Sequence, residues 1–403
     1  MAPMFDRPLA VGVILPPPPA DPAKAPLAAA VAKSALDGAA YGDQDFKFNG
    51  EIVGFDFSVN TVVAGGAVAV TAAANKLLDE GVFGLMGGFT IEEVQALSKV
   101  AKQRNVPYIN VGVASDSLRA TCEATTYHLA PSAAMYLDAI VGWYVRSGYR
   151  QWYFIHEDTP EGKAQYDRLK WSMNERHFGA KEAGKTVLKP GAAGGTALTN
   201  SIRRSGADVI VLLTSAEDQL RLLEELDKAG IATPVAGYPS YEAQSRAFYA
   251  ASRKAAPTLG TAFRATAWEG TIDAYGAREW NARFLLEYRA PMESPGWAIY
   301  HGVKTLYEAA FFTQSDKAAD LLRFMNDQDH VFDLHKGVGT TFRPWDHQMR
   351  QSLFLVKINA KESAPMEGAL LVGELPAIYM PGTQLNERLD QLGDLASRNR
   401  CPR

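Results

Sequence analysis

The sequence predicts an α/β protein built from two doubly wound parallel-sheet lobes joined by a three-segment hinge. Apolar runs of strand length alternate with helical stretches along most of the chain, as in a parallel sheet wrapped by helices. The first run, LAVGVIL at residues 9–15, is almost entirely apolar, as expected of a strand buried on both faces. The alternation starts again near residue 130, and a chain of 403 residues is long enough for two domains.

The elements of the first lobe alternate regularly. Strands are predicted at residues 9–15, 51–58, 82–86 and 108–111, and helices at residues 23–40, 68–80 and 91–104. The second lobe repeats the pattern. Its helices are predicted at residues 135–147, 162–178, 196–205 and 216–229, and its strands at residues 151–156, 182–187, 209–213 and 234–236. Apolar residues recur at helical spacing in the stretches assigned as helices.

The chain after residue 260 departs from this rhythm. A strand-like piece, GTAFRATAW, is followed by predicted helices at residues 273–288, 294–313 and 316–327. A hairpin is predicted at residues 341–358, and the last stretch, from about residue 360, is interrupted by prolines.

Composition excludes several classes of protein. The net charge is -4, so the strongly basic face of a nucleic-acid-binding protein is not expected. No apolar run reaches the roughly 18 residues of a transmembrane helix, and we expect no membrane insertion. The N-terminus, MAPMFDRPLAVGV, lacks the basic and apolar regions of a signal peptide. If the protein is exported, we expect this sequence to be its mature chain.

Sequence motifs for catalysis or cofactor binding are weak. Residues 179–186, GAKEAGKT, match the phosphate-loop pattern. That loop requires a strand before it and a helix at its lysine, whereas here a helix precedes it and a β-branched stretch follows. The seven histidines are scattered, and the two cysteines lack zinc-binding spacing. We therefore expect no metal, no cofactor and no enzymatic activity; an enzyme would need a nucleophile or a paired acid and base.

Cys122 and Cys401 are the two cysteines of the chain. Two free thiols are one interpretation. The other is a disulfide that ties the C-terminal tail to the first lobe, which an oxidising compartment would permit. For an exported protein we predict the disulfide.

Candidate ligand-binding residues follow from the fold. In doubly wound sheets, ligands bind outside the carboxyl ends of the strands. The loops there are residues 16–21, 87–93, 112–117, 157–161, 214–218 and 237–242. The predicted binding residues are Phe89, Thr90, Ala114, Ser115 and Asp116 in the first lobe, and Glu157, Asp158, Glu161, Ser215, Tyr238 and Tyr241 in the second. Trp268 is predicted as a further binding residue. The alternative is that acids such as Asp158, Glu217 and Asp218 cap the helices that follow.

Several stretches resemble a known family. They are LAVGVIL, AVAVTAAANKLLDEGVFGLMGG, NVPYINVGVASDSL, YFIHEDTPEGKAQYDRL and ADVIVLLTSAEDQLRLLEELDKAGIATPVAGY. Together they are similar to type I periplasmic solute-binding proteins of the leucine/branched-chain amino-acid receptor family, over about residues 8–358. The resemblance implies a periplasmic, monomeric protein whose lobes close on a small molecule and deliver it to an ABC transporter permease.

The family topology also implies domain boundaries. Three crossovers are expected, near residues 128–131, 262–268 and 339–343. Lobe 1 is then residues 1–130 plus 268–340, and lobe 2 is residues 131–262 plus 341–360. Residues 361–403 are expected to be an extension that packs on the lobes.

The predicted ligand loops depart from the family pattern. Its amino-acid receptors bind the ligand carboxylate with hydroxyls and backbone N–H groups after the third strand, where this chain has GGFTIEE. We therefore expect a ligand other than a standard aliphatic amino acid. The chain also resembles receptors found with PQQ-dependent alcohol dehydrogenase systems, which implies a small organic molecule, PQQ or a lanthanide. A ligand-sensing domain without a transporter and a true amino-acid receptor stay open as alternatives.

Overall fold

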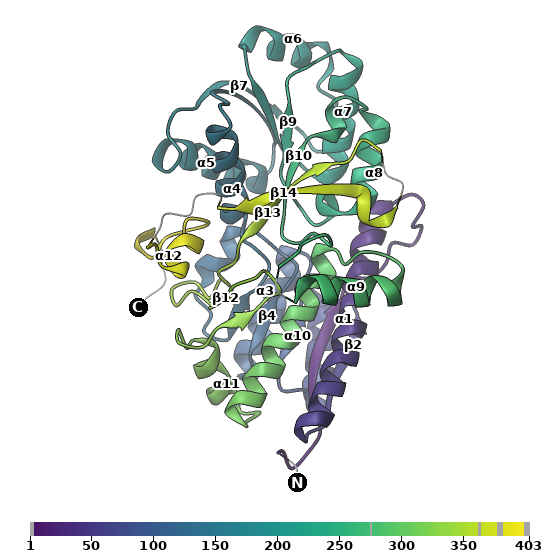
Figure 1. The fold of residues 1–403 in the computed structure, drawn as a ribbon, viewed down its shortest axis with the longest axis vertical. Coiled ribbons are helices and arrows are strands. Elements are labelled where there is room, and N and C mark those ends of the chain that lie inside the picture. Colours follow the sequence, from purple (N-terminus) through teal and green to yellow (C-terminus); the bar gives the residue numbers. More distant parts are fainter. Residues whose placement is uncertain (1–3, 275, 362–363, 377–381, 399–403) are drawn as a thin grey trace. The chain divides into compact units, whose positions relative to one another are not determined.

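The computed structural model describes residues 4–274, 276–361, 364–376 and 382–398 (Figure 1). The chain forms two compact units. Unit 1 consists of residues 1–132, 273–351 and 395–403, and unit 2 of residues 133–272 and 352–394. Each unit contains a parallel sheet flanked by helices, so the predicted α/β class is confirmed. The lobe boundaries derived from the resemblance stay predictions.

Unit 1 is built on a parallel sheet of order β2-β1-β3-β4-β5. Its strands are β1 (Leu9–Leu15), β2 (Phe57–Val63), β3 (Leu85–Gly87), β4 (Tyr108–Asn110) and β5 (Thr126–His128). Its helices are α1 (Pro26–Val53), α2 (Ala67–Asp79), α3 (Ile91–Arg104), the 3-10 helix η1 (Asp116–Thr121), α9 (Ala277–Tyr288), α10 (Ser294–Thr313) and α11 (Ala318–Met325). Two short strands, β11 (Phe332–Asp333) and β12 (Gly339–Thr340), pair with each other.

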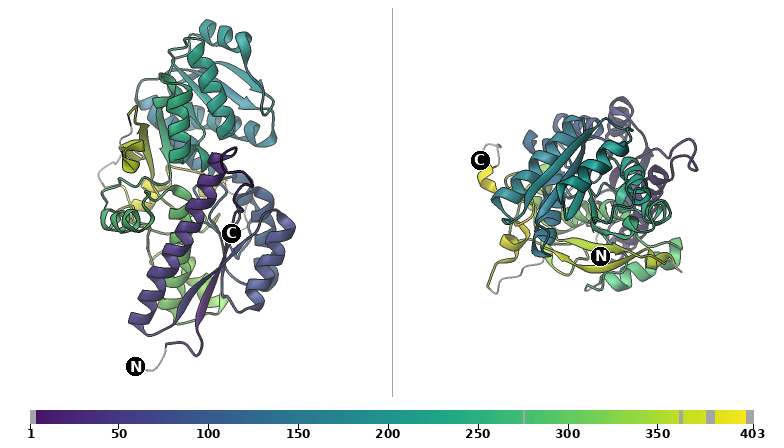
Figure 2. Two further views of the ribbon diagram at one scale, coloured as in Figure 1. Left: turned by 90° about the vertical axis from the view of Figure 1, so that its right-hand side faces the viewer. Right: turned by 90° about the horizontal axis from the view of Figure 1, so that it is seen from above.

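Helices cover both faces of the unit 1 sheet. On one face, Leu77 of α2 and Leu97 of α3 pack against Leu85 of β3 in an apolar core. On the other face, α1 and α10 lie side by side (Figure 2). A Cβ atom on Gly38 of α1 would lie 2.3 Å from the carbonyl oxygen of Gly296 in α10. The two helix backbones therefore meet so closely that neither position has room for a side chain.

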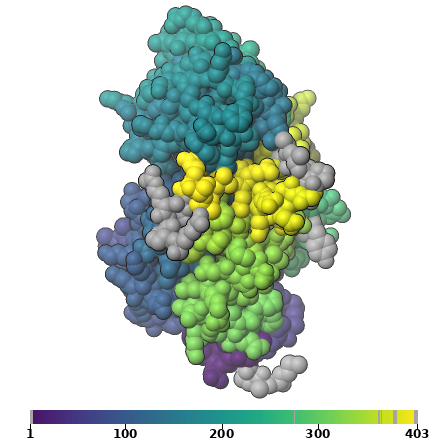
Figure 3. Space-filling model, turned by 90° about the vertical axis from the view of Figure 1, so that its left-hand side faces the viewer, coloured from purple at the N-terminus to yellow at the C-terminus, as the bar shows by residue number. Residues whose placement is uncertain are grey.

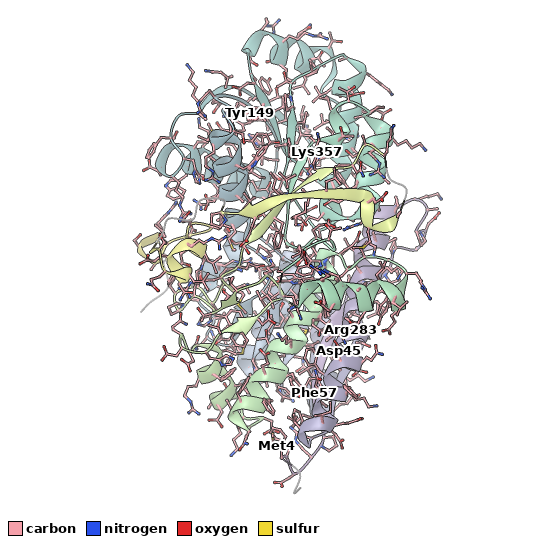
Figure 4. All side chains as sticks on the ribbon, in the orientation of Figure 1. Met4, Asp45, Phe57, Tyr149, Arg283 and Lys357 are labelled. Carbon is pink, nitrogen blue, oxygen red and sulfur yellow. The ribbon has the colours of Figure 1, made fainter. Side chains whose placement is uncertain are left out.

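An exposed ion pair joins two helices in unit 1. Arg283 of α9 lies beside Asp45 of α1 (Figure 4), with 3.4 Å between Nη1 and Oδ1. Because the arginine is exposed, this pair contributes little to stability. The aromatic contacts of Tyr41 with Trp280 and Phe284 bury far more surface at the same junction.

Unit 2 contains a parallel sheet of order β7-β6-β8-β9 and a three-stranded antiparallel sheet of order β10-β13-β14. Its strands are β6 (Gln151–Glu157), β7 (Lys181–Leu188), β8 (Val209–Leu213), β9 (Val235–Gly237), β10 (Phe263–Thr266), β13 (Leu353–Ile358) and β14 (Ala369–Leu375). Its helices are α4 (Ala133–Arg146), α5 (Pro160–Glu175), α6 (Gly195–Ser205), α7 (Ala216–Lys228), α8 (Arg246–Ala255) and α12 (Leu385–Leu389). Short 3-10 helices are η2 (Glu242–Gln244), η3 (Leu259–Thr261), η4 (Pro365–Gly368) and, in the unit 1 tail, η5 (Ala396–Arg398).

The C-terminal part of unit 2 is attached through a buried carboxylate. Figure 3 shows the C-terminal part of the chain, in yellow, on the molecular surface. Gly393 donates its N–H to Asp138 of α4 over 2.9 Å, and Arg176 donates to the carbonyl of Gln391 over 2.6 Å. Asp138 also binds Arg168 and Ser172, each over 2.6 Å. This cluster holds the segment after α12 against α4 and α5.

Several elements differ from the sequence prediction, two of them markedly. Residues 51–53, predicted to open a strand, are the last turn of α1, which ends at Gly54 in the left-handed region with φ 93°. The strand therefore begins at Phe57. The hairpin predicted at residues 341–358 is also wrong. Only residues 353–358 are a strand, and it pairs with β10 and β14, whereas Phe342 and Met349 share an isolated bridge.

The predicted bounds of four other elements are confirmed. Strands β1 and β8 and helices α3 and α10 have the predicted bounds. Lys185 and Thr186 of the phosphate-loop pattern lie inside strand β7, so no helix begins at that lysine. In the part of the chain that the structure describes, no helix is both long enough and apolar enough to cross a membrane.

Candidate functional site

The loop after β3 carries the first two predicted binding residues. Thr90 is the N-cap of α3 and accepts a hydrogen bond from the N–H of Glu93. In return, Oε2 of Glu93 accepts the N–H groups of Phe89 over 2.9 Å and Thr90 over 3.2 Å. Oε1 of Glu93 accepts the N–H of Gly66, in the loop after β2, over 2.7 Å. One buried carboxylate therefore joins two strand-end loops and occupies three backbone donors.

The loop after β4 carries Ala114, Ser115 and Asp116. Oδ1 of Asn110 accepts the N–H groups of Gly112 over 3.2 Å and Val113 over 3.0 Å. Ser115 is buried, Ala114 is half-buried, and Asp116 begins η1.

The side chain of Arg119 in η1 hydrogen-bonds to the backbone of the loop after β4. The guanidinium donates to the carbonyl oxygens of Val113 and Ser115, each over 2.9 Å. It also donates to the carbonyl of Ala130 over 2.8 Å and to Oε1 of Gln348 over 3.0 Å. Because Arg119 is buried, these bonds offset the free-energy cost of removing its guanidinium from water. They also fix the backbone around the predicted binding residues.

The loops after β6 and β8 meet in unit 2. Oε1 of Glu157 accepts the N–H of Ser215 over 2.6 Å. The hydroxyl of Ser215 is the N-cap of α7 and accepts the N–H of Asp218. Asp158 is exposed, and the cap of α5 beside it is Thr159. Capping, which the sequence left open for the acids, is thus performed here by hydroxyl side chains.

The loops after β9 and β10 contain the predicted aromatic residues. Tyr238, Tyr241 and Trp268 are all buried, at 8%, 8% and 1% exposure. The ring of Tyr238 lies edge-on to that of Tyr136, with centroids 6.4 Å apart. Tyr238 and Tyr136 thus form an aromatic pair at the carboxyl end of β9.

Two buried glutamines hold these loops. Nε2 of Gln219 donates to the carbonyls of Thr214 over 3.1 Å and Tyr238 over 2.7 Å, and its Oε1 accepts from Arg264 over 2.5 Å. A Cβ on Gly237 would lie 2.0 Å from that oxygen, so a larger residue at this position would displace the Gln219 amide.

The second glutamine, Gln244, joins the β9 loop to the end of β10. Its Nε2 donates to the carbonyl of Pro239 over 2.6 Å and to the hydroxyl of Tyr136 over 3.0 Å. Its Oε1 accepts from the N–H of Ala267 over 2.8 Å and from Thr266 over 3.0 Å. The amide thereby uses both its donors and its acceptor.

The residue after Trp268 is a fully buried glutamate. Glu269 is 0% exposed, and its Oε1 pairs with Arg246 over 2.5 Å. The hydroxyl of Thr271 lies 3.5 Å from the same oxygen. The other oxygen, Oε2, is buried and has no hydrogen-bond partner among the described residues.

The structure places the predicted residues as two sets. In unit 1, Phe89 and Thr90 follow β3, and residues 114–116 follow β4; in unit 2, the remaining residues follow β6, β8, β9 and β10. Sequence reasoning missed the residues that hold the loops, which are Glu93, Asn110, Arg119, Gln219, Gln244, Arg264 and Glu269. The spacing T-x-x-E at residues 90–93 is the signature of a capping box and could have identified Glu93. No local signal marks the others.

A pocket of about 530 Å³ lies elsewhere in unit 1. It is lined by α3, η1 and β5, including Ser98, Lys102, Thr126 and His128, and by none of the predicted binding residues. Within the described residues, no group of three or more His, Cys, Asp or Glu side chains could hold a metal ion. Cys122 is disulfide-bonded, and its predicted partner, Cys401, lies outside the described residues.

Comparison with known proteins identifies a matching family and solved structures with a similar fold. The model of a family described as periplasmic binding protein matches residues 22–363. A search of curated protein sequences found no significant match.

Solved structures match nearly the whole chain. The closed leucine-, isoleucine-, valine-, threonine- and alanine-binding protein of Brucella ovis has a TM-score of 0.78 at 13% identity, with 97% of each chain covered. An amino-acid ABC transporter substrate-binding protein of Pseudomonas fluorescens Pf-5 has a TM-score of 0.77 at 16% identity, covering 95% of this chain and 99% of that one. A solute-binding protein of R. palustris in complex with benzoate has a TM-score of 0.71 at 15% identity, covering 91% and 96%.

Proposed function

The chain belongs to the periplasmic binding protein family, the non-enzymatic solute-binding components of ABC transporters, and on that premise we propose that its ligand is not a standard aliphatic amino acid. We propose further that the protein works as a monomer in the periplasm and delivers this ligand to an ABC permease. The strand-end loops of both units supply the binding residues predicted from the sequence, and closure on the ligand is the expected mechanism.

One observation carries the proposal. Backbone N–H groups at the strand ends, which would bind a ligand carboxylate, are bonded to the protein's own acceptors. Glu93 occupies those of Phe89 and Thr90, and Asn110 occupies those of Gly112 and Val113. In unit 2, Glu157 occupies the N–H of Ser215. A zwitterionic amino acid would therefore meet negative charge where its carboxylate needs donors.

The buried aromatic residues support a ligand with an apolar or aromatic part. Tyr238, Tyr241 and Trp268 supply large rigid faces beside a few polar groups, the usual composition of a small-molecule site. The benzoate complex of the R. palustris protein is an instance of this fold with an aromatic ligand. A small organic molecule of PQQ-dependent alcohol oxidation, PQQ itself and a lanthanide ion stay in the proposal as candidates from the resemblance.

Native mass spectrometry of the protein as purified, followed by thermal-shift assays, tests the proposal. The panel is leucine, isoleucine, benzoate, alcohol-derived acids, PQQ and lanthanum chloride. We expect at least one non-amino-acid compound to raise the Tm by mass action, and leucine and isoleucine to leave it unchanged. A clear shift with leucine would overturn the exclusion of aliphatic amino acids.

A further inference from the structure

We propose that unit 1 holds a second binding site, for a small organic monocarboxylate, in the pocket between α3 and β5. The inference goes beyond the proposed function, because none of the predicted binding residues lines this pocket. It rests on two buried hydrogen-bond donors that lack an acceptor among the described residues, and on the charge of the side chains around them.

One face of strand β5 forms a wall of the pocket. Side chains alternate along a strand, so Thr126 and His128 share one face, while Tyr127 between them donates to the carbonyl of Leu322 in α11 over 3.4 Å. The hydroxyls of Thr126 and of Ser98 in α3 are 2.6 Å apart, so the shared face is turned toward α3. The pocket there measures about 530 Å³, which is within the range of small-molecule sites.

The first donor is the imidazole of His128, which is 3% exposed and lines the pocket. Oδ1 of Asn110 accepts the N–H groups of Gly112 and Val113, which identifies the other end of this amide as the donor. That Nδ2 lies 3.1 Å from Nδ1 of His128, so Nδ1 is an acceptor. Burial, together with Arg119, lowers the pKa of His128 well below its usual value, and the neutral ring therefore carries its proton on Nε2. Among the described residues this N–H has no acceptor.

The second donor is a hydroxyl of the Ser98–Thr126 pair. Both side chains are buried, at 8% and 4% exposure, and they bond to each other. Whichever hydroxyl donates in that bond, the proton of the other has no acceptor within the described part of the chain. A buried donor without an acceptor costs free energy. The pocket therefore favours a ligand group that accepts two hydrogen bonds.

The charge of the lining favours an anion. Lys102 is paired with Glu123, with 3.0 Å between Nζ and Oε2. Lys99, exposed at the rim, has no ion pair among the described residues. Val94 and Leu118 belong to the apolar core and supply apolar wall. A monocarboxylate with a short alkyl chain matches this lining, because its oxygens accept from the two donors, its charge is attracted by the lysine, and its chain contacts the apolar wall.

Three compounds of equal length test the ligand class. Pentanoate, pentanamide and pentylamine differ in charge, and their binding is measured by calorimetry. We expect pentanoate to bind, pentanamide to bind about tenfold more weakly because charge-assisted bonds become neutral ones, and pentylamine not to bind. No binding of pentanoate, or equal binding of pentylamine, would overturn the inference.

NMR of the histidine side chains tests the first donor directly. We expect long-range proton–nitrogen spectra at pH 7 to show His128 with its proton on Nε2, and pentanoate to shift that signal. The signal of His177 in unit 2 is the internal control and should not move. A proton on Nδ1, or an Nε2 signal that pentanoate leaves unchanged, would contradict the proposal.

Variants assign the carboxylate to this pocket. His128→Phe keeps a planar ring but removes the donor, and we expect it to weaken binding of pentanoate by about tenfold or more. Lys99→Met should weaken it by about threefold, whereas Lys47→Met, at another exposed lysine of unit 1, should bind like the wild type.

A double variant covers the case in which His128→Phe does not fold. Ser98→Ala combined with Thr126→Val removes the second donor and should also weaken binding of pentanoate by about tenfold. Unchanged affinity in either folded variant would mean that the carboxylate binds elsewhere, and the inference would be wrong. The proposed function would stand in that case, because it depends on the strand-end loops and not on this pocket.

Discussion

The two units hold their strand-end loops with different chemistry. In unit 1 the loops after β3 and β4 are held by charged side chains, the carboxylate of Glu93 and the guanidinium of Arg119. In unit 2 the loops after β8 and β9 are held mainly by the neutral amides of Gln219 and Gln244. The division is one of degree, because Glu157 also accepts the N–H of Ser215 in unit 2 and the amide of Asn110 accepts two N–H groups in unit 1. In both units, each of these side chains supplies hydrogen-bond partners for several loop backbone groups that would otherwise have none.

The difference has an energetic consequence. Charged donors and acceptors make stronger hydrogen bonds than neutral ones but cost more to bury and to leave unpaired. We therefore expect unit 1 to depend more on single side chains, whereas unit 2 spreads the same task over two amides. The predictions below test this contrast, from the largest expected effect to the smallest.

The largest effect is expected at Arg119. Arg119→Met removes all four hydrogen bonds of the guanidinium and leaves the buried carbonyls of Val113, Ser115 and Ala130 without it. We expect unfolding by urea, followed by circular dichroism, to show a loss of about 3–5 kcal/mol. Arg104→Met is the control, since Arg104 pairs with the exposed Asp79, and should lose less than about 1 kcal/mol. Equal losses would contradict the contrast.

A smaller loss is expected at Gln219 in unit 2. Gln219→Leu leaves two carbonyls and one N–H of Arg264 unsatisfied, while Gln244 still holds the neighbouring loop. We expect a loss of about 2–3 kcal/mol in the same measurement. Hydrogen exchange should rise in residues 214–215 and 238–240 and stay unchanged in residues 87–93. Glu224→Leu on the exposed face of α7 controls for the change in polarity.

The substitution Glu93→Gln tests how much the negative charge of Glu93 contributes to holding the unit 1 loops. The amide keeps the size of the side chain but has one acceptor oxygen in place of two, so at least one of the three backbone donors loses its partner. We expect a loss of about 1–2 kcal/mol. Glu92→Gln, at the exposed position before it in the same helical turn, should be within about 0.5 kcal/mol of the wild type.

The smallest effect is a dependence on pH that both units share. Burial, together with the nearby Arg146, Arg176 and Arg168, lowers the pKa of His177 in unit 2 to about 4. Burial likewise lowers the pKa of His335 in unit 1 to about 4. Both folded-state pKa values lie below the unfolded value of about 6.5, so each histidine contributes stability above that pH. This stability is lost as the pH falls from about 6.5 to 4.

Replacing one histidine sharpens this comparison. Urea unfolding at pH 7 and pH 4.5 should show a smaller decline for His177→Gln than for the wild type, because the variant lacks one of the histidines whose pKa is lowered by folding. The variant retains part of the decline if the two units contribute separately. An unchanged decline would mean that folding does not lower the pKa of His177.

Local patterns were enough for most of the fold. Helix α3 has a capping box at its start and regular apolar spacing, so its bounds could be read from adjacent residues. The end of α1 could not, because GEIVGFDFS is apolar and β-branched enough for a strand, and only the left-handed Gly54 ends the helix there. Likewise, residues 353–358 pair with β10, about 90 residues earlier, rather than with the adjacent segment.

The residues of the candidate site likewise divide into those that the sequence could predict and those that it could not. The strand-end rule led to Phe89, Ser215 and Tyr238, since it needs only the ends of strands. The side chains that hold those loops act over long separations, as Arg264 of strand β10 does on Gln219 of helix α7, 45 residues away. Glu269 was missed because its free oxygen is a property of the packed structure and has no counterpart in the sequence.

The close contact of Gly38 with Gly296 has a consequence for the order of folding. The helix that begins at residue 26 gains its packing partner only when residue 313 has been synthesised. Unit 2, in turn, needs β13 and β14, at residues 353–375, to complete its second sheet. Neither unit can therefore finish its core on the ribosome until nearly the whole chain has been made. Until then, the core of each unit stays incomplete.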